Sequence, residues 1–406
     1  MRKIPVYWKT VLAFILFTGL LALAGFITPF CDWYTNALYP YLCDGISHIT
    51  GPVPFAVGEI IMYLGAVSLI CGILFLILLV FKRKKSGYRK FCAGYFKTLL
   101  MVLVCIVFIY MPAWYIPFCG TVLGGENVNA KTSYSFEELQ DVARYAVEGI
   151  NSAAEFIVTN PDGTVDFPDD EEARILIAEA MHGISSRYPR LGGYYPPVKT
   201  ALCSDILERM YIGGFNYPFT MEPTINKYTG PMTSYSLKAH EYCHHKGYEK
   251  ENEANFLSEL ALTESSDPFM RLSAFWDMYS WICDDYLTEV DSVIDGMIKS
   301  GEVKMPYEPG TQEYFRALKK IAEQINDIPC ISNRANMIYT ESFEIKTEIY
   351  EADSHPIDEM PKVETVIEEV SDTGWEVQGE ILKENSYDGV TLLWLQYFDE
   401  MKQRKR

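Results

Sequence analysis

Two histidines and a glutamate stand at a spacing that suits a metal ion. The run His240-Glu241-Tyr242-Cys243-His244 separates its imidazoles by four residues, which places both on one face of a helix. Both can therefore reach a single Zn²⁺ at about 2.0–2.1 Å. Zinc lowers the pKa of a bound water, so Glu241 can take its proton while hydroxide attacks a carbonyl carbon. The pattern predicts a hydrolytic zinc centre, with His240 and His244 as ligands and Glu241 as general base.

A catalytic zinc needs a third protein ligand and one open position. Gly247 is a natural helix stop that can turn the chain back towards the metal. In the helix expected after it, Glu251 and Asn255 are four residues apart and share a face. We therefore expect Glu251 to bind zinc and Asn255 to support one of the imidazoles. Glu253 points to another face and is the second choice as ligand.

Four other side chains require interpretation. His245 either hydrogen-bonds substrate or lies in solvent on the helix surface, and we favour the solvated position. Tyr248 and Tyr387 are candidate donors to substrate or to the oxyanion, although packing at the rim is the commoner role for such rings. Cys243 is expected to be a small buried hydrophobe that points into the core.

The stretch 213–219 mixes glycines with aromatic residues in alternation, which predicts a short strand or hairpin just before the motif. Such a segment has two possible roles. It can be an edge strand that pairs with an extended peptide substrate through main-chain hydrogen bonds. It can equally be a structural hairpin that covers the helix carrying the motif.

The elements that must hold this centre are predicted to be mainly α, in an α+β arrangement with that small sheet or hairpin. Ser135 and Glu138 form a capping-box pattern, which predicts a helix over 136–156. The stretch 339–378 is rich in acids and β-branched residues, and we expect an irregular surface insertion there. The other predicted helices cover 169–186, 238–247, 250–263, 268–298, 312–325 and 390–401.

The first 120 residues contain three apolar stretches of about the length that a membrane-spanning helix needs, over 11–30, 55–81 and 98–116. Lys and Arg gather before the first stretch and between the second and third, and such basic loops mark the cytoplasmic side. We therefore expect a cytoplasmic N-terminus. The division that follows is a membrane anchor over 1–120 and an extracytoplasmic domain over 121–406.

Charge separates the same two parts. The chain has a net charge of −19, and its first 120 residues hold ten basic and three acidic residues, so the remainder is about −26. A polyanionic domain argues against nucleic acid as a partner, because phosphate binding needs concentrated Lys and Arg. The partners expected are the lipid bilayer and a peptide or protein substrate.

Cys31 and Cys43 bracket one outer loop and are the pair most favoured for a disulfide.

Several of these segments together resemble a known family. Residues 214–226 (GFNYPFTMEPTIN), the His-Glu-x-x-His run and 386–390 (SYDGV) resemble a bacterial membrane-protein family catalogued as domain of unknown function 3810. This resemblance implies N-terminal spans and a zincin-like outer domain. The tail 251–255 also resembles gluzincin peptidases, in which its first Glu binds zinc, a role that falls here on Glu251. Only six residues separate His244 from Glu251, fewer than in most gluzincins, so Glu253 stays open as the ligand.

Two functions remain in view. The leading one is a membrane-anchored zinc metallopeptidase that hydrolyses peptide bonds outside the cell. The alternative is a non-catalytic zinc-binding sensor or interaction domain on the same anchor, against which the retained base Glu241 argues. Intramembrane proteolysis is disfavoured because the segment 238–255 is too polar to lie in lipid. A transporter is disfavoured because the three stretches carry no charge pair that could line a pathway.

Overall fold

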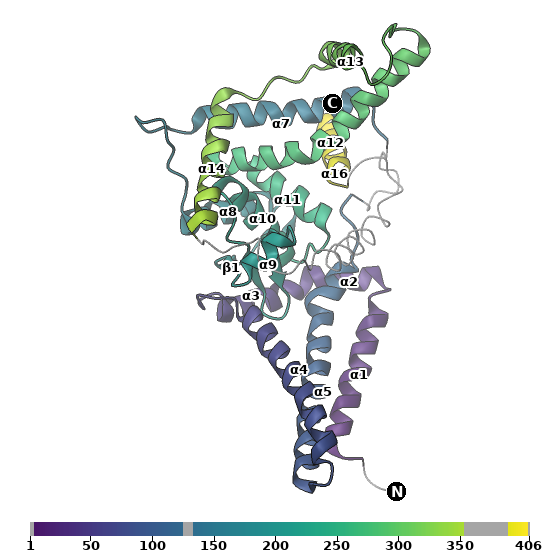
Figure 1. Ribbon diagram of the computed structural model, residues 1–406, viewed down its shortest axis with the longest axis vertical. Helices are drawn as coiled ribbons and strands as arrows, with labels where there is room; N and C mark the ends of the chain where they lie inside the picture. The colour runs from purple at the N-terminus through teal and green to yellow at the C-terminus, as the bar shows by residue number, and fades with distance from the viewer. Residues whose placement is uncertain (1–3, 125–132, 353–388, 405–406) are drawn as a thin grey trace.

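The computed structural model describes residues 4–124, 133–352 and 389–404. Most of these residues are helical, and a three-stranded sheet is present beside the helices. Three long helices extend from one side of a globular helical part (Figure 1). The predicted mainly α class with a small sheet is therefore confirmed.

The three extended helices are α1 (Val6–Ala24), α4 (Val57–Lys82) and α5 (Ser86–Tyr110). The last continues through a π-helical turn, Met111–Tyr115, into the short helix α6 (Ile116–Phe118). All three are long and apolar enough to cross a membrane, and few of their residues are buried in the protein. Their number and approximate positions agree with the three predicted spans, although the first ends six residues early because a new helix begins at Thr28.

Two short helices, α2 (Thr28–Ala37) and α3 (Tyr39–Thr50), lie across the upper ends of α1, α4 and α5 (Figure 1). This stretch was expected to be an outer loop with Cys31 and Cys43 as the most favoured disulfide pair, and that expectation is wrong, because two helices stand there without a bridge. All ten cysteines are free thiols. Cys31 is buried within α2, with its sulfur 3.6 Å from the Ala24 carbonyl oxygen, whereas Cys43 faces the globular part from α3. The two residues stand on separate helices, since α2 ends just before Leu38 and α3 begins just after it.

A helical core surrounds the motif. Its central helix α10 (Pro231–His245) packs against α11 (Glu251–Thr263) and α12 (Pro268–Ser300), and α12 packs along α7 (Phe136–Phe156). The predicted capping box is present, because Ser135 accepts from the Glu138 N–H and Glu138 accepts from the Ser135 N–H. The remaining helices of this part are α8 (Asp170–Ile184), α9 (Ser204–Arg209), α13 (Gln312–Ile325), α14 (Asn333–Ala352) and α16 (Gly389–Arg404).

One helix replaces part of the predicted insertion. The acid-rich stretch was expected to be irregular from residue 339, yet α14 continues as far as Ala352, and residues 353–378 lie outside the described part of the chain. Ala335, Ile338 and Ser342 are buried against the rest of the protein. Two of these residues precede the acid-rich stretch, so packing at the start of α14 and at Ser342 outweighs the unfavourable β-branched composition that follows, as tertiary packing often does.

The sheet has the order β1-β3-β2, with strands Lys199–Thr200, Glu222–Ile225 and Gly214–Tyr217 respectively. Strand β3 is central and fully buried, pairing parallel to β1 and antiparallel to β2. Strand β2 therefore stands at an edge, and both β2 and β3 pack against α10. The hairpin expected around 213–219 is present and packs against the helix that carries the motif. Its outer strand β2 is an edge, while pairing of that edge with a substrate stays a prediction.

Candidate metal centre

The turn after α10 brings two parts of the candidate centre together. Helix α10 ends at His245, and Gly247 follows with φ +82°, a left-handed conformation that glycine adopts without strain. The Tyr248 N–H then bonds back to the Cys243 carbonyl at 3.0 Å, which closes the helix end. Because the chain reverses within these few residues, α11 begins at Glu251 directly beside the histidines. The short segment between His244 and Glu251 is therefore long enough to bring Glu251 beside both histidines.

His240, His244 and Glu251 form the one cluster of potential metal ligands found among the described residues. Glu251 Oε2 lies 3.2 Å from His240 Nε2, and Glu251 Oε1 lies 3.5 Å from His244 Nε2. Donor atoms bound at about 2.0–2.1 Å by a tetrahedral zinc lie about 3.3–3.4 Å apart. The two separations between Glu251 and the histidines are therefore close to those of a tetrahedral ligand set, and one donor atom from each of the three side chains lies within 4.8 Å of the others. Two imidazoles with a carboxylate suit zinc.

A backbone contact fixes the tautomer of one ligand. His244 Nδ1 lies 2.8 Å from the carbonyl oxygen of Tyr248. A carbonyl oxygen can only accept, so Nδ1 carries a proton and donates, which leaves Nε2 as the nitrogen that faces Glu251 and would bind a metal in place of its proton. Metal-binding histidines usually have such a partner on the nitrogen that does not bind. Asn255 was expected in this role, but no hydrogen bond between its side chain and an imidazole occurs in the described structure, where the Tyr248 carbonyl serves His244 instead.

Glu241 is almost completely buried, and its Oε2 has no hydrogen-bond partner among the described atoms. Its other oxygen faces β2, because a Cβ added to Gly214 would lie 2.7 Å from Oε1. Burial raises the pKa of Glu241 to about 8; the charge of His244 opposes this shift, and those of Glu251 and Glu249 add to it. A buried carboxylate with an unpaired oxygen is costly unless a cation or a polar molecule lies beside it. The orphaned oxygen therefore fits a site that receives a metal ion and its water.

Glu251 and the two imidazoles interact strongly with one another within the cluster. Burial alone would lower the pKa of His244, but contact with Glu251 and the charges of Glu241 and Glu249 outweigh it and raise this pKa to about 10. Burial would raise the pKa of Glu251, yet its hydrogen bonds to both imidazoles hold that pKa well below the usual range. Glu251 is thus ionised and placed between two donors, where a divalent cation would take over the role of the protons.

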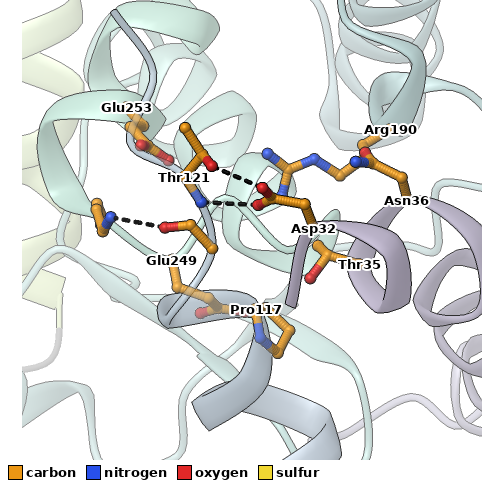
Figure 2. Close-up of a pocket in the computed structure, with 10 residues that line it drawn as sticks. Asp32, Thr35, Asn36, Pro117, Thr121, Arg190, Glu249 and Glu253 are labelled. Atoms are coloured by element: carbon orange, nitrogen blue, oxygen red, sulfur yellow. Dashed lines mark hydrogen bonds between the residues drawn. The ribbon is translucent and has the colours of Figure 1, made fainter. Parts of the chain in front are cut away.

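Glu253, the second choice as ligand, points elsewhere. Its Oε1 accepts from the Leu123 N–H at 2.7 Å, and it lines a small cavity on the side of α11 that faces the segment after α6 (Figure 2). That cavity, of about 20 Å³, has room for a single water molecule. Asp32 also lines it and accepts from the Thr121 backbone and hydroxyl. Glu253 therefore belongs to a group of polar contacts that joins α2 to α11, and it is not part of the ligand cluster.

The same cavity contains a residue that the sequence analysis missed. Glu249 is buried, with Oε1 unpartnered in the described structure, and burial raises its pKa to about 8. The charge of His244 partly opposes that shift in Glu249. No spacing rule identifies it, since it lies in the turn between two helices. Its burial results from α2 and α6, which close over the turn from the other side.

His245 has neither of its two predicted environments, whereas Tyr248 has a packing role, the commoner of the two that the sequence left open. His245 is completely buried rather than solvated or facing substrate, because α3 covers this side of α10. Its Nε2 lies 3.2 Å from Cys43 Sγ, and burial lowers its pKa well below the usual value. The Tyr248 ring is buried with the Arg190 guanidinium 3.6 Å above its centroid, so it packs instead of facing the ligand cluster. Cys243 is buried in the core as predicted.

Tyr387, the other candidate donor, lies outside the described residues. The structure therefore brings His240, His244, Glu251 and Glu241 together. Of the other candidates, Tyr248 contacts the cluster through its carbonyl, whereas Glu253 and His245 have their contacts elsewhere. Asn255 lies one helical turn beyond Glu251 on α11 and is half-buried.

Comparison with known proteins identifies the family. A family model described as "Protein of unknown function (DUF3810)" matches residues 34–340, about three quarters of the chain. The chain therefore belongs to this family. The match includes α3, the sheet and the whole ligand cluster. Searches of curated proteins and of solved structures gave no significant match.

Proposed function

We propose that this chain is a membrane-anchored zinc metallopeptidase that hydrolyses peptide bonds outside the cell. The observation that carries the proposal is Glu241, a buried carboxylate with a free oxygen next to a three-donor cluster. A structural zinc site is closed by four protein ligands, whereas three donors leave one position open. A site that only held a metal would gain nothing from a buried acid that binds neither metal nor protein.

The residues of the chain have distinct tasks in this reaction. His240, His244 and Glu251 would hold Zn²⁺, which supplies Lewis-acid polarisation of the water and the scissile carbonyl. Glu241 accepts the proton of the attacking water and returns it to the leaving amine, a task that its position beside the ligand cluster and its unpartnered oxygen allow. Strand β2 offers an edge to the extended substrate, and its Gly214 allows the backbone to approach Glu241 closely.

The orientation is argued from charge. Helices α1, α4 and α5 would form the anchor, and the basic cluster at 82–90 lies at the end of α4 and start of α5 that is far from the globular part. Short basic loops stay on the cytoplasmic side, so the acidic globular part would face outwards. The zinc-binding sensor is the second candidate, because an intact ligand cluster alone would also serve it.

The test compares the full chain with Glu241→Gln, both purified in detergent and loaded with zinc, on a mixture of unstructured peptides. We expect Glu241→Gln to keep its zinc and to lose about 100-fold or more of its hydrolysis rate, since general-base catalysis contributes about that much. Glu179→Gln, an exposed change on α8, is the matched control and should behave as wild type. Equal hydrolysis by wild type and Glu241→Gln would contradict the proposal. Bound zinc without hydrolysis in either protein would favour the sensor.

A further inference from the structure

Strand β2 leads from the reactive centre to the top of a membrane helix. At one end, Gly214 lies against Glu241, where an added Cβ would be 2.7 Å from Oε1. At the other end, Tyr217 packs on Gly58 of α4, where an added Cβ would lie 2.4 Å from the ring. Three residues of strand cover about 10 Å. The general base therefore stands about 10 Å along the strand from the first turn of α4.

The turn that follows β2 rests on the other elements of the anchor. The Phe219 ring lies 6.3 Å from that of Tyr110 at the end of α5. The Thr50 hydroxyl of α3 donates to the Thr220 carbonyl at 2.9 Å. Tyr39, also on α3, places its hydroxyl 3.7 Å from Met221 Sδ. The hairpin is thus in contact with α3, α4 and α5 at once.

Buried polar contacts fix this arrangement. Glu222 of β3 accepts from the backbone N–H groups of Val57 and Gly58, at 3.0 and 2.8 Å. Lys199 of β1 pairs with Glu222 and also donates to the carbonyls of Thr50 and Phe55, at 2.8 and 3.0 Å. Glu222 and Lys199 are both nearly inaccessible to solvent. The position of the sheet relative to α4 is therefore fixed, because moving the sheet would leave buried charges without partners.

In this position the sheet would be close to the bilayer surface. Helix α4 has 26 residues and is about 39 Å long, whereas the hydrocarbon core of a bilayer is about 30 Å thick. With the basic end at Lys82 in the opposite interface, its first turns would lie among the lipid headgroups. Three exposed apolar residues lie around the first turns of α4, namely Phe55, Leu202 and Ile206. Leu202 is tied to α4 by its backbone N–H, which donates to Glu59 at 2.8 Å. This apolar surface continues that of α4 and would contact the outer leaflet.

From this geometry we infer that the substrate is a polypeptide anchored in the same membrane, cut a few residues outside its anchor. This inference rests on the proposed peptidase function. A peptide paired with β2 passes from Glu241 towards the tops of α4 and α5, so an anchored chain reaches the site with a short extended segment. Confinement to the membrane also raises its effective concentration, an advantage that a soluble peptide lacks.

The test uses the full chain in lipid nanodiscs or liposomes and a randomised cleavable segment joined to one transmembrane helix through spacers of different length. The same segments on a soluble carrier are the comparison. We expect cleavage to be fastest with spacers of about three to six residues, which extend about 10–20 Å. The rate should fall by at least about ten-fold for spacers beyond fifteen residues and for the soluble carrier.

Cleavage rates that do not depend on the anchor or on the spacer would overturn the inference while leaving the peptidase function intact. Absence of zinc-dependent cleavage of either library, with wild type equal to Glu241→Gln, would overturn both. Charged changes on the apolar surface give an independent check. Leu202→Glu with Ile206→Glu should slow only the anchored substrates, whereas Ile175→Glu, an equally exposed change on α8, should alter neither rate. Equal loss on soluble substrates would contradict a role of this surface in membrane contact.

Discussion

At the scale of single residues, the centre depends on which carboxylate completes the ligand set. Glu251 contacts both imidazoles, whereas Glu253, two residues later, bonds to the Leu123 backbone. We predict that Glu251→Gln lowers zinc affinity by more than about 100-fold, because even the loss of a residue that supports a ligand costs about 10–100-fold. Competition with a chromophoric chelator measures this in the purified full chain.

The matched control for that change is Glu253→Gln. An amide oxygen can still accept from the Leu123 N–H, so this variant should keep the wild-type affinity for zinc within a few-fold. A larger loss in Glu253→Gln than in Glu251→Gln would show that the carboxylates exchange roles when metal binds, and would exclude the ligand set given above.

Most of the cluster was predictable from sequence, because the pattern of the motif follows helical geometry. A four-residue spacing predicts a shared face for His240 and His244 wherever the helix lies, and the glycine stop after them predicted that Glu251 would lie nearby. The structure does bring these three side chains together, while their role as metal ligands stays a prediction. Burial of His245 and Glu249 was not predictable in this way. Both are covered by α2, α3 and α6, so their environment depends on contacts with residues about 130 to 200 positions earlier in the chain.

At the scale of elements, the turn between α10 and α11 positions the third ligand. Gly247 has φ +82° in this turn, and an added Cβ would lie 3.0 Å from Tyr39 and 3.2 Å from Thr35. We predict that Gly247→Ala lowers the free energy of unfolding by about 2–3 kcal/mol, from left-handed strain together with this steric conflict. The variant should also lose zinc affinity, because the displaced turn carries the Tyr248 carbonyl that orients His244.

Gly301 provides the comparison for that prediction. It ends α12 with φ +77°, and nothing lies within 4 Å of an added Cβ. Gly301→Ala should therefore show the backbone strain alone, about 1 kcal/mol, with zinc affinity unchanged. Denaturant titration in detergent and the same chelator competition give both quantities. Equal effects of the two substitutions would mean that α2 and α3 do not pack tightly on the turn.

The long helices were predictable because caps and apolar periodicity are local signals. Ser135 caps α7 and Asp267 caps α12 through the hydrogen bonds expected of such residues. The short helices α2, α3 and α9 were not predicted. Each has at most twelve residues, so its stability depends on packing more than on its own propensity. Helix α14 was missed for a related reason, since its buried face becomes evident only from its neighbours.

At the scale of the whole molecule, the candidate centre and the anchor share a set of contacts. Helix α3 covers His245, while Glu222 and Lys199 bond to the backbone that joins α3 to α4. Helix α1, in contrast, contacts α5 and the turn after it and has no comparable contact with the sheet or with α10. Helix α3 and the start of α4 are therefore more important to the candidate centre than helix α1.

This difference predicts the behaviour of two truncated proteins. A fragment of residues 121–406 lacks α2, α3 and the start of α4, so Glu222 and Lys199 lose four hydrogen bonds and His245 loses its cover. Such losses, at about 1 kcal/mol or more each, are large against a total stability of about 5–15 kcal/mol. We expect this fragment to aggregate and to bind no stoichiometric zinc. Removal of residues 1–24 alone should leave zinc binding in detergent intact, and a monodisperse, zinc-loaded 121–406 fragment would refute the dependence of the centre on the anchor.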